Sequence, residues 1–228
     1  YFNFSCKPRS YKKCISIPMD KKFVNKQLSK LRNIPQPVQN SEEWFKIRYN
    51  KFTASSAWKA LGSEAAKNSF IYSKCKEFDA SKYSTVNINS ATHHGHKFEP
   101  ISIKYYEKMY NTEIEEFGCL PDDKTDFIAA SPDGINVKKN SDKYGYLLEI
   151  KNPVSRELTG TPKLDYWIQM QVQMYVTKLH QCDFLETVIK EYKTEDDFYN
   201  DGTFSLTKNN KEKGIIVCFH DGNKPIYE

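Results

Sequence analysis

Three strand signals and a tight turn between residues 127 and 151 constrain the fold more than any other part of the sequence. Residues 127–137 are typical of a short buried strand and a returning strand, joined by a Ser-Pro-Asp-Gly turn at residues 131–134. Residues 146–151 alternate between two faces, so that Glu149 and Lys151 lie on the same side of a further strand. The sequence therefore predicts a β-sheet that carries an acid and a base side by side.

Helical signals surround these strands. Ser41 is a good N-cap, and two glutamates follow it in the first turn, where the helix dipole favours acidic residues. Pro100 fits only the first turn of a helix, so we expect that helix to begin near His96. The predicted helices cover residues 22–31, 41–49, 53–62, 96–110 and 164–179, and further strands cover residues 184–192 and 214–219. This order predicts an α/β fold, in which helices flank a central mixed sheet.

Length and composition fit a single globular domain. The chain has 228 residues, of which 39% are hydrophobic and 28% charged, too rich in core-forming residues for a disordered chain. No apolar run approaches the roughly 20 residues of a membrane-spanning helix. The first residues are broken by charges and a proline, unlike a secretory signal peptide. We therefore expect an intracellular protein, in the cytoplasm or the nucleus of a host cell, with no membrane partner.

The six cysteines are scattered along the chain without any Cys-x-x-Cys pair. Zinc sites and iron–sulfur clusters need closely spaced ligands, so this distribution argues against both. In a reducing compartment a disulfide framework is not expected either.

Charge is distributed unevenly along the chain. The net charge is +5, but residues 1–80 carry 16 basic and 6 acidic side chains, whereas residues 81–228 carry 18 and 23. Prolines near residues 34–40 mark a boundary, which predicts a basic N-terminal arm over residues 1–40 and a folded domain over residues 41–228. Such an arm could bind a polyanion, or it could be a solvated tail.

The chemistry is concentrated in one motif. Pro132-Asp133, followed sixteen residues later by Glu149-Ile150-Lys151, is the Pro-Asp…(Asp/Glu)-x-Lys pattern of a large group of nucleases. Mg²⁺ prefers oxygen ligands, so both carboxylates and the carbonyl of Ile150 can hold the metal. Lys151 can orient or help to deprotonate the attacking water and can offset charge in the transition state. Taken alone, the pattern also fits a turn beside an exposed strand.

Further residues stand in a fixed order around this motif. The ordered set is Trp44-x-x-x-Arg48 with Ser55, then Gly95-x-x-x-Glu99, then the Pro-Asp and Glu-x-Lys elements, and finally Tyr166-x-x-Gln169-x-Gln171. This arrangement resembles the YqaJ-type viral recombinase family, which includes the phage lambda exonuclease and viral alkaline exonucleases. The resemblance covers about residues 41–192 and implies a restriction-endonuclease-like core.

The resemblance implies roles for individual residues. Glu99 would join Asp133 and Glu149 as a ligand of two Mg²⁺ ions, for which Mn²⁺ can substitute. Lys151 would be the catalytic lysine, and Gln169 would line the active site.

The resemblance also implies that Arg48 and Ser55 hold the 5′-phosphate of a DNA end. The residue types agree, because a planar guanidinium suits a terminal phosphate and the start of a helix offers free N–H groups. His93, His94 and His96 could contact phosphate or metal, but surface or structural roles are the simpler interpretation.

These observations predict a Mg²⁺-dependent exonuclease that degrades double-stranded DNA from 5′-phosphorylated ends, in the 5′-to-3′ direction, leaving 3′ single strands for recombination. Two alternatives remain open: an endonuclease on the same core, and a non-catalytic module that binds DNA ends. An RNA substrate also stays open, because no residue visibly reads a 2′-hydroxyl. The family resemblance adds a single-strand annealing protein as a partner and a homo-oligomer, a ring trimer, as the assembly.

Overall fold

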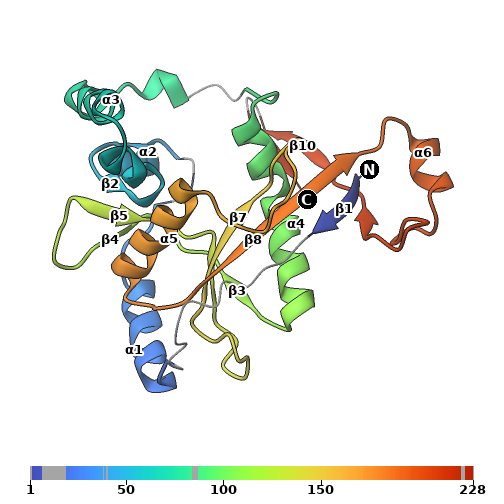
Figure 1. Ribbon diagram of the computed structural model, residues 1–228, viewed down its shortest axis with the longest axis horizontal. Coiled ribbons are helices and arrows are strands. Elements are labelled where there is room, and N and C mark those ends of the chain that lie inside the picture. The colour runs from blue at the N-terminus through green and yellow to red at the C-terminus, as the bar shows by residue number, and fades with distance from the viewer. Residues whose placement is uncertain are drawn as a thin grey trace.

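A six-stranded mixed sheet runs through the molecule (Figure 1). The structure is a computed structural model, and it describes residues 2–6, 19–37, 39, 41–83, 87–221 and 224–227. In sheet order its strands are β3 (Ile114–Glu115), β6 (Gly134–Asn136), β7 (Leu147–Lys151), β8 (Cys182–Glu191), β1 (Phe2–Cys6) and β9 (Lys213–Gly214). Strands β7 and β8 run parallel, and the other neighbours are antiparallel. The predicted α/β fold with a mixed sheet is therefore confirmed.

The remaining elements surround this sheet. A three-stranded sheet joins β2 (Phe52–Thr53), β5 (Ile128–Ala130) and β4 (Leu120–Pro121), and β10 (Cys218–Asp221) pairs with β11 (Lys224–Tyr227). The helices are α1 (Lys21–Arg32), α2 (Glu42–Tyr49), α3 (Glu64–Cys75), α4 (Ala91–Tyr110), α5 (Leu164–Thr177) and α6 (Glu195–Asn200), with 3₁₀ segments η1 (Ala54–Leu61) and η2 (Ala80–Tyr83). No helix in the described part of the chain is both long and apolar enough to cross a membrane.

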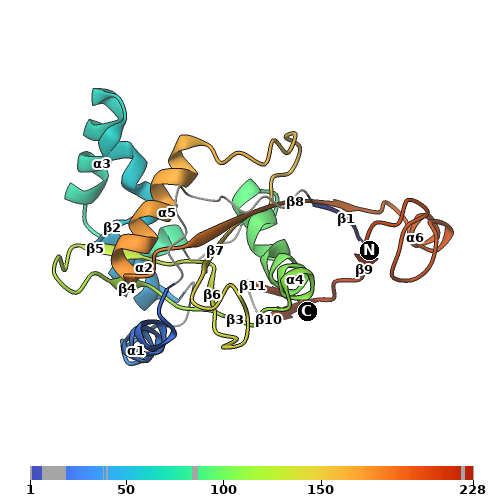
Figure 2. The same ribbon diagram turned by 60° about the horizontal axis from the view of Figure 1, so that its bottom comes forward.

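Helices cover both faces of β7, which explains its burial (Figure 2). Leu148 and Ile150 pack with Tyr106 of α4 on one face. Leu147 packs with Val176 of α5 on the other. The alternation predicted for this strand is confirmed, and it sends Glu149 and Lys151 toward the α5 face.

Two predicted helix starts have different outcomes. The Ser41 side chain accepts a hydrogen bond from the backbone N–H of Trp44 at 3.2 Å, as an N-cap should. Helix α4, however, begins after Ser90, whose side chain accepts from the N–H of His93 at 3.1 Å. Pro100 therefore lies inside the helix, and the predicted start near residue 96 is wrong. The cap at Ser90 decides the start, while the proline only deprives one carbonyl of its partner.

The N-terminal segments are part of the folded body. Strand β1 pairs with β8 along its whole length, although about 180 residues separate them in sequence. In α1, Val24, Leu28 and Leu31 are almost fully buried and join the main core. Arg32 pairs with Glu115 of β3. The domain boundary at residue 40 stays a prediction, but the described parts of residues 1–40 do not form a free arm, because their apolar faces and backbone are used by the fold.

The polar segment after β8 is more ordered than its sequence suggests. Residues 193–213 include α6, which has a capping box between Thr194 and Asp197. The strand predicted at residues 214–219 is divided between β9 and β10. This region extends beyond the rest of the molecule at the right of Figure 1.

Candidate active site

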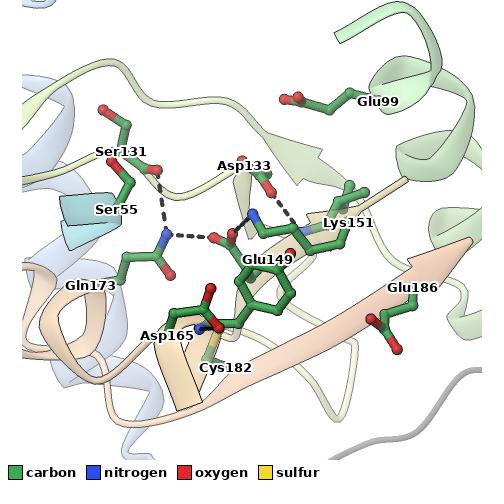
Figure 3. Close-up of polar contacts among 12 residues, drawn as sticks. Ser55, Glu99, Ser131, Asp133, Glu149, Lys151, Asp165, Gln173, Cys182 and Glu186 are labelled. Carbon is green, nitrogen blue, oxygen red and sulfur yellow. Dashed lines mark hydrogen bonds and ion pairs between the residues drawn. The ribbon is translucent and has the colours of Figure 1, made fainter. Parts of the chain in front are cut away.

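Asp133, Glu149 and Lys151 come together where β6 pairs with β7 (Figure 3). Asp133 directly precedes β6, and its Oδ2 accepts a hydrogen bond of 2.5 Å from the backbone N–H of Ile150. The Lys151 ammonium donates to Glu149 Oε1 and forms an ion pair with it. The hairpin thus places two carboxylates and an ammonium on adjoining strands, as the sequence motif predicted.

Gln173 on α5 holds the second oxygen of Glu149. Glu149 is fully buried, and Gln173 Nε2 donates to its Oε2 at 2.6 Å and to the carbonyl of Ser131 at 3.3 Å. Gln173 is also fully buried, and within the described part of the chain its own Oε1 has no hydrogen-bond partner. Buried carboxylates need such partners, since an unpaired charge in the interior is costly.

The family resemblance predicts Gln169, and not Gln173, for the active site. Gln169 lies one helical turn before Gln173 on the same helix and is half-buried. Residues four apart share a face, so periodicity alone could not choose between them. The structure brings Gln173 to Glu149, and the proposed role of Gln169 stays a prediction.

The charges at this site act strongly on one another. Burial raises the pKa of Asp133 well above its usual value, and the negative charges of Glu149 and Glu99 raise it further. Burial lowers the pKa of Lys151, but Glu149 and Asp133 outweigh this effect and raise it overall. Lys151 is therefore held as a protonated cation, and the charged form of Asp133 is disfavoured by its burial and by Glu149 and Glu99.

Glu99 reaches the same space from α4 (Figure 3). His96 Nδ1 lies 3.8 Å from Glu99 Oε2. Glu116, which the sequence analysis did not select, has a pKa raised by burial and by the charge of Glu99. No sequence motif marks Glu116, so only the fold reveals this additional carboxylate.

The donor set suits a hard cation. Among the described residues, no group of three or more Asp, Glu, His or Cys side chains is arranged so that it could hold a metal ion without moving. Nevertheless, burial and the negative charges of Glu149 and Glu99 raise the pKa of Asp133, so a cation among these three carboxylates would relieve the repulsion. Oxygen donors of this kind are those that Mg²⁺, Mn²⁺ and Ca²⁺ prefer.

Arg48 forms a second cluster beside the first. Its guanidinium stacks on Trp44 at 4.4 Å, donates to Ser131 Oγ at 2.9 Å and donates to Ser55 Oγ at 3.2 Å. Burial lowers its pKa, and among the described residues no carboxylate pairs with it. A partly buried cation whose described partners are all uncharged is an unbalanced charge, which an anionic ligand would balance.

Ser131 connects the two clusters. Its hydroxyl accepts from Arg48, and its carbonyl accepts from Gln173, which also bonds Glu149. The sequence could not reveal this connection, because Ser131 was noticed only as a turn residue. The predicted phosphate pocket and the predicted catalytic residues therefore belong to one continuous site.

Comparison with known proteins agrees with this arrangement. The model of the YqaJ-like viral recombinase domain matches residues 43–180. The chain belongs to this family. Over 217 residues it is 36% identical to an uncharacterized protein of Acanthamoeba polyphaga mimivirus, a match that covers 87% of this chain and 39% of that protein. The chain thus spans about two fifths of this viral relative.

Solved structures share the fold. An alkaline exonuclease from Laribacter hongkongensis superposes with a TM-score of 0.52 and 28% identity, covering 69% of this chain and 77% of the other. The same enzyme in complex with dAMP gives a TM-score of 0.51, with 27% identity and the same coverage. This member of the YqaJ-like family therefore has a restriction-endonuclease-like core, as predicted.

Proposed function

We propose that this protein is a Mg²⁺-dependent exonuclease that degrades double-stranded DNA from 5′-phosphorylated ends, in the 5′-to-3′ direction. The observation that carries the proposal is the partly buried guanidinium of Arg48, which has no acidic partner among the described residues and connects through Ser131 and Gln173 to Glu149 and Lys151. The solved relatives, described as an alkaline exonuclease, support the same reaction class.

Asp133, Glu149, Glu99 and the carbonyl of Ile150 would hold the Mg²⁺ ions, two in number, and Mn²⁺ would substitute. When bound, the metal would polarise the scissile phosphate and make bound water more acidic. Burial of Glu149 against Gln173 keeps this carboxylate in one orientation, so the ligand is placed before substrate arrives.

Lys151 would act as a cation and not as a free base. Its raised pKa keeps it protonated at neutral and alkaline pH, so it can donate hydrogen bonds to the attacking water and to the negative phosphate of the transition state. The aromatic ring of Tyr166 lies 5.1 Å from its Nζ and helps to hold the ammonium in place.

The direction of digestion would follow from the position of the phosphate pocket. Arg48, Ser55 and Ser131 would hold the terminal 5′-phosphate, and the next phosphodiester would then lie at the carboxylates. A strand bound in this way loses its 5′ nucleotide, and the new 5′-phosphate moves into the pocket. The opposite strand would remain as a 3′ single strand for recombination.

The test uses end-labelled linear DNA with 5′-phosphate or 5′-hydroxyl ends, with Mg²⁺ or with EDTA. We expect Glu149→Gln and Lys151→Ala to abolish digestion, by at least about a hundredfold, since each removes a charge at the reacting phosphate. Arg48→Gln should remove the preference for phosphorylated ends. Digestion by Lys151→Ala at the wild-type rate would refute the assignment.

Closed circular DNA separates the alternatives. An exonuclease cannot begin on a circle, so cleavage of circular DNA would instead indicate an endonuclease on the same core. Binding to DNA ends without any cleavage in Mg²⁺ or Mn²⁺ would indicate a non-catalytic module. We also propose a homo-oligomer, a ring trimer, that hands the 3′ strand to a single-strand annealing protein; sedimentation analysis tests the assembly.

A further inference from the structure

A cavity of about 860 Å³ opens beside Arg48, and its described lining includes none of the carboxylates of the candidate site. Its walls come from α2, η1, α3 and η2 on one side, and from α4 and the β10–β11 hairpin on the other. His96 and Pro100 of α4 line it, on either side of Glu99 in sequence. The cavity therefore begins at the proposed phosphate pocket and continues beyond it.

Positive charge gathers around this cavity. The lining residues described in the structure include no aspartate or glutamate, but they do include Arg48, Lys59, Lys74 and Lys82. Burial lowers the pKa of Lys74, and the charges of Arg48 and Lys59 lower it further, so these cations act on one another at close range. Lys82 is 3.5 Å from Asp79, which lies outside the lining. Such a cavity attracts a polyanion.

Aromatic side chains make up much of the remaining wall. Phe45 and Tyr83 stack with their ring centroids 4.2 Å apart, and Tyr227 lines the opposite side. Trp44, which lines the Arg48 end, is only 7% exposed, and among the described residues its buried Nε1–H has no hydrogen-bond partner. Cations that track a backbone, combined with aromatic rings on which bases stack, are typical of sites for single-stranded nucleic acid.

The size and position of the cavity indicate which strand it would hold. A volume of about 860 Å³ lies in the upper part of the range of ligand pockets, roughly 300 to 1,000 Å³, so the cavity has room for a nucleotide. A flush DNA end would place its terminal phosphate at Arg48 and nothing beyond it. Nucleotides beyond Arg48 exist only when the 5′ strand continues past the duplex.

We propose that this cavity binds the nucleotides of a single-stranded 5′ tail, so that the enzyme accepts DNA ends whose 5′ strand extends beyond the duplex. The inference rests on the proposed function and adds a substrate class to it. An internal phosphate of the tail occupies the Arg48 pocket. Water attacks the scissile phosphorus and the P–O3′ bond breaks. The tail leaves with a 3′-hydroxyl, and the shortened strand keeps a 5′-phosphate.

The test compares one duplex with a flush 5′-phosphorylated end and with 5′ tails of two and four nucleotides. Wild type should cut all three. Lys59→Ala should lower kcat/KM on tailed ends, relative to kcat/KM on the flush end, by about fivefold. It should also reduce the slope of log binding constant against log salt concentration by about the value of one phosphate contact. The matched control is Lys67→Ala on α3, which removes the same charge outside the cavity, at a residue paired with Glu64. It should leave the ratio unchanged.

A fluorescent tail gives a readout that does not need cleavage. With 2-aminopurine in the tail and EDTA in the buffer, stacking on aromatic rings quenches the fluorescence of the base, and Tyr83→Leu should restore part of it. Equal effects of Lys59→Ala on tailed and flush ends, or no quenching in wild type, would overturn the inference. Relief of product inhibition by dAMP on flush ends in Lys59→Ala would overturn it too, because the cavity would then hold released nucleotide. Failure to digest flush ends would instead overturn the proposed function.

Discussion

Replacing Gln173 with leucine isolates the contact that holds the buried carboxylate of Glu149. The change keeps the approximate volume but removes the 2.6 Å hydrogen bond to Glu149 Oε2 and the 3.3 Å bond to the carbonyl of Ser131. A hydrogen bond to a charged group contributes about 1.5 to 3 kcal/mol. Leucine also removes the buried Gln173 Oε1, which has no hydrogen-bond partner among the described residues, and this gain offsets part of the lost stability. In a chain of this size the expected loss lowers Tm by about 3 to 12 °C.

Gln169→Leu is the matched control, because it makes the same substitution one turn earlier on α5. Thermal unfolding in EDTA, followed by circular dichroism, compares the two variants without any contribution from metal or DNA. We expect the Tm of Gln169→Leu to stay within about 2 °C of wild type, as is usual away from buried networks. If Gln169→Leu is the less stable variant, or if both are neutral, Gln173 does not support Glu149 as the structure indicates.

Two further perturbations test other parts of the fold. In EDTA at pH 8, Asp133→Asn should raise Tm by about 2 to 4 °C, because burial, Glu149 and Glu99 raise the pKa of the native carboxyl. A carboxyl whose native pKa is raised stabilises the fold at acid pH, and this stabilisation is lost as pH rises through the native pKa. The Tm gain of Asp133→Asn should therefore shrink as pH falls toward about 4. An equal Tm gain at pH 5 and pH 8 would contradict the assigned cause. Leu28→Ala should reduce the free energy of unfolding in urea by about 2 to 5 kcal/mol, whereas exposed Lys26→Ala should not; equal stabilities would mean that α1 is a dispensable arm.

Local patterns made much of the site predictable. Ser41 caps its helix, and β7 alternates between the two faces, because capping and pleating depend on neighbouring residues alone. Asp133 and Glu149 could also be paired in advance, since a hairpin brings residues a short distance apart in sequence onto adjoining strands. The choice of Arg48 depended on a family resemblance rather than on any local pattern.

Contacts between distant segments were not predictable. The start of α4 at Ser90 is a different case, because two local signals compete there and the cap at Ser90 prevails over Pro100. The pairing of β1 with β8 joins segments from opposite ends of the chain, and no periodicity encodes a partner. The basic charges near the N-terminus suggested an arm because sequence shows charge but not the acidic side chains that neutralise it, as Glu115 does for Arg32.

The sequence by itself determined the chemistry of this protein: the carboxylates, the lysine and the arginine, and the strand and turn that present them. Tertiary structure decided which of these groups are paired. It made Glu149 a buried carboxylate with both oxygens hydrogen-bonded, brought Gln173 to that carboxylate, and left Arg48 without an acidic partner among the described residues. The physical reason is that residue type and local periodicity fix donors, acceptors and faces, whereas burial and charge compensation depend on which distant segments pack together.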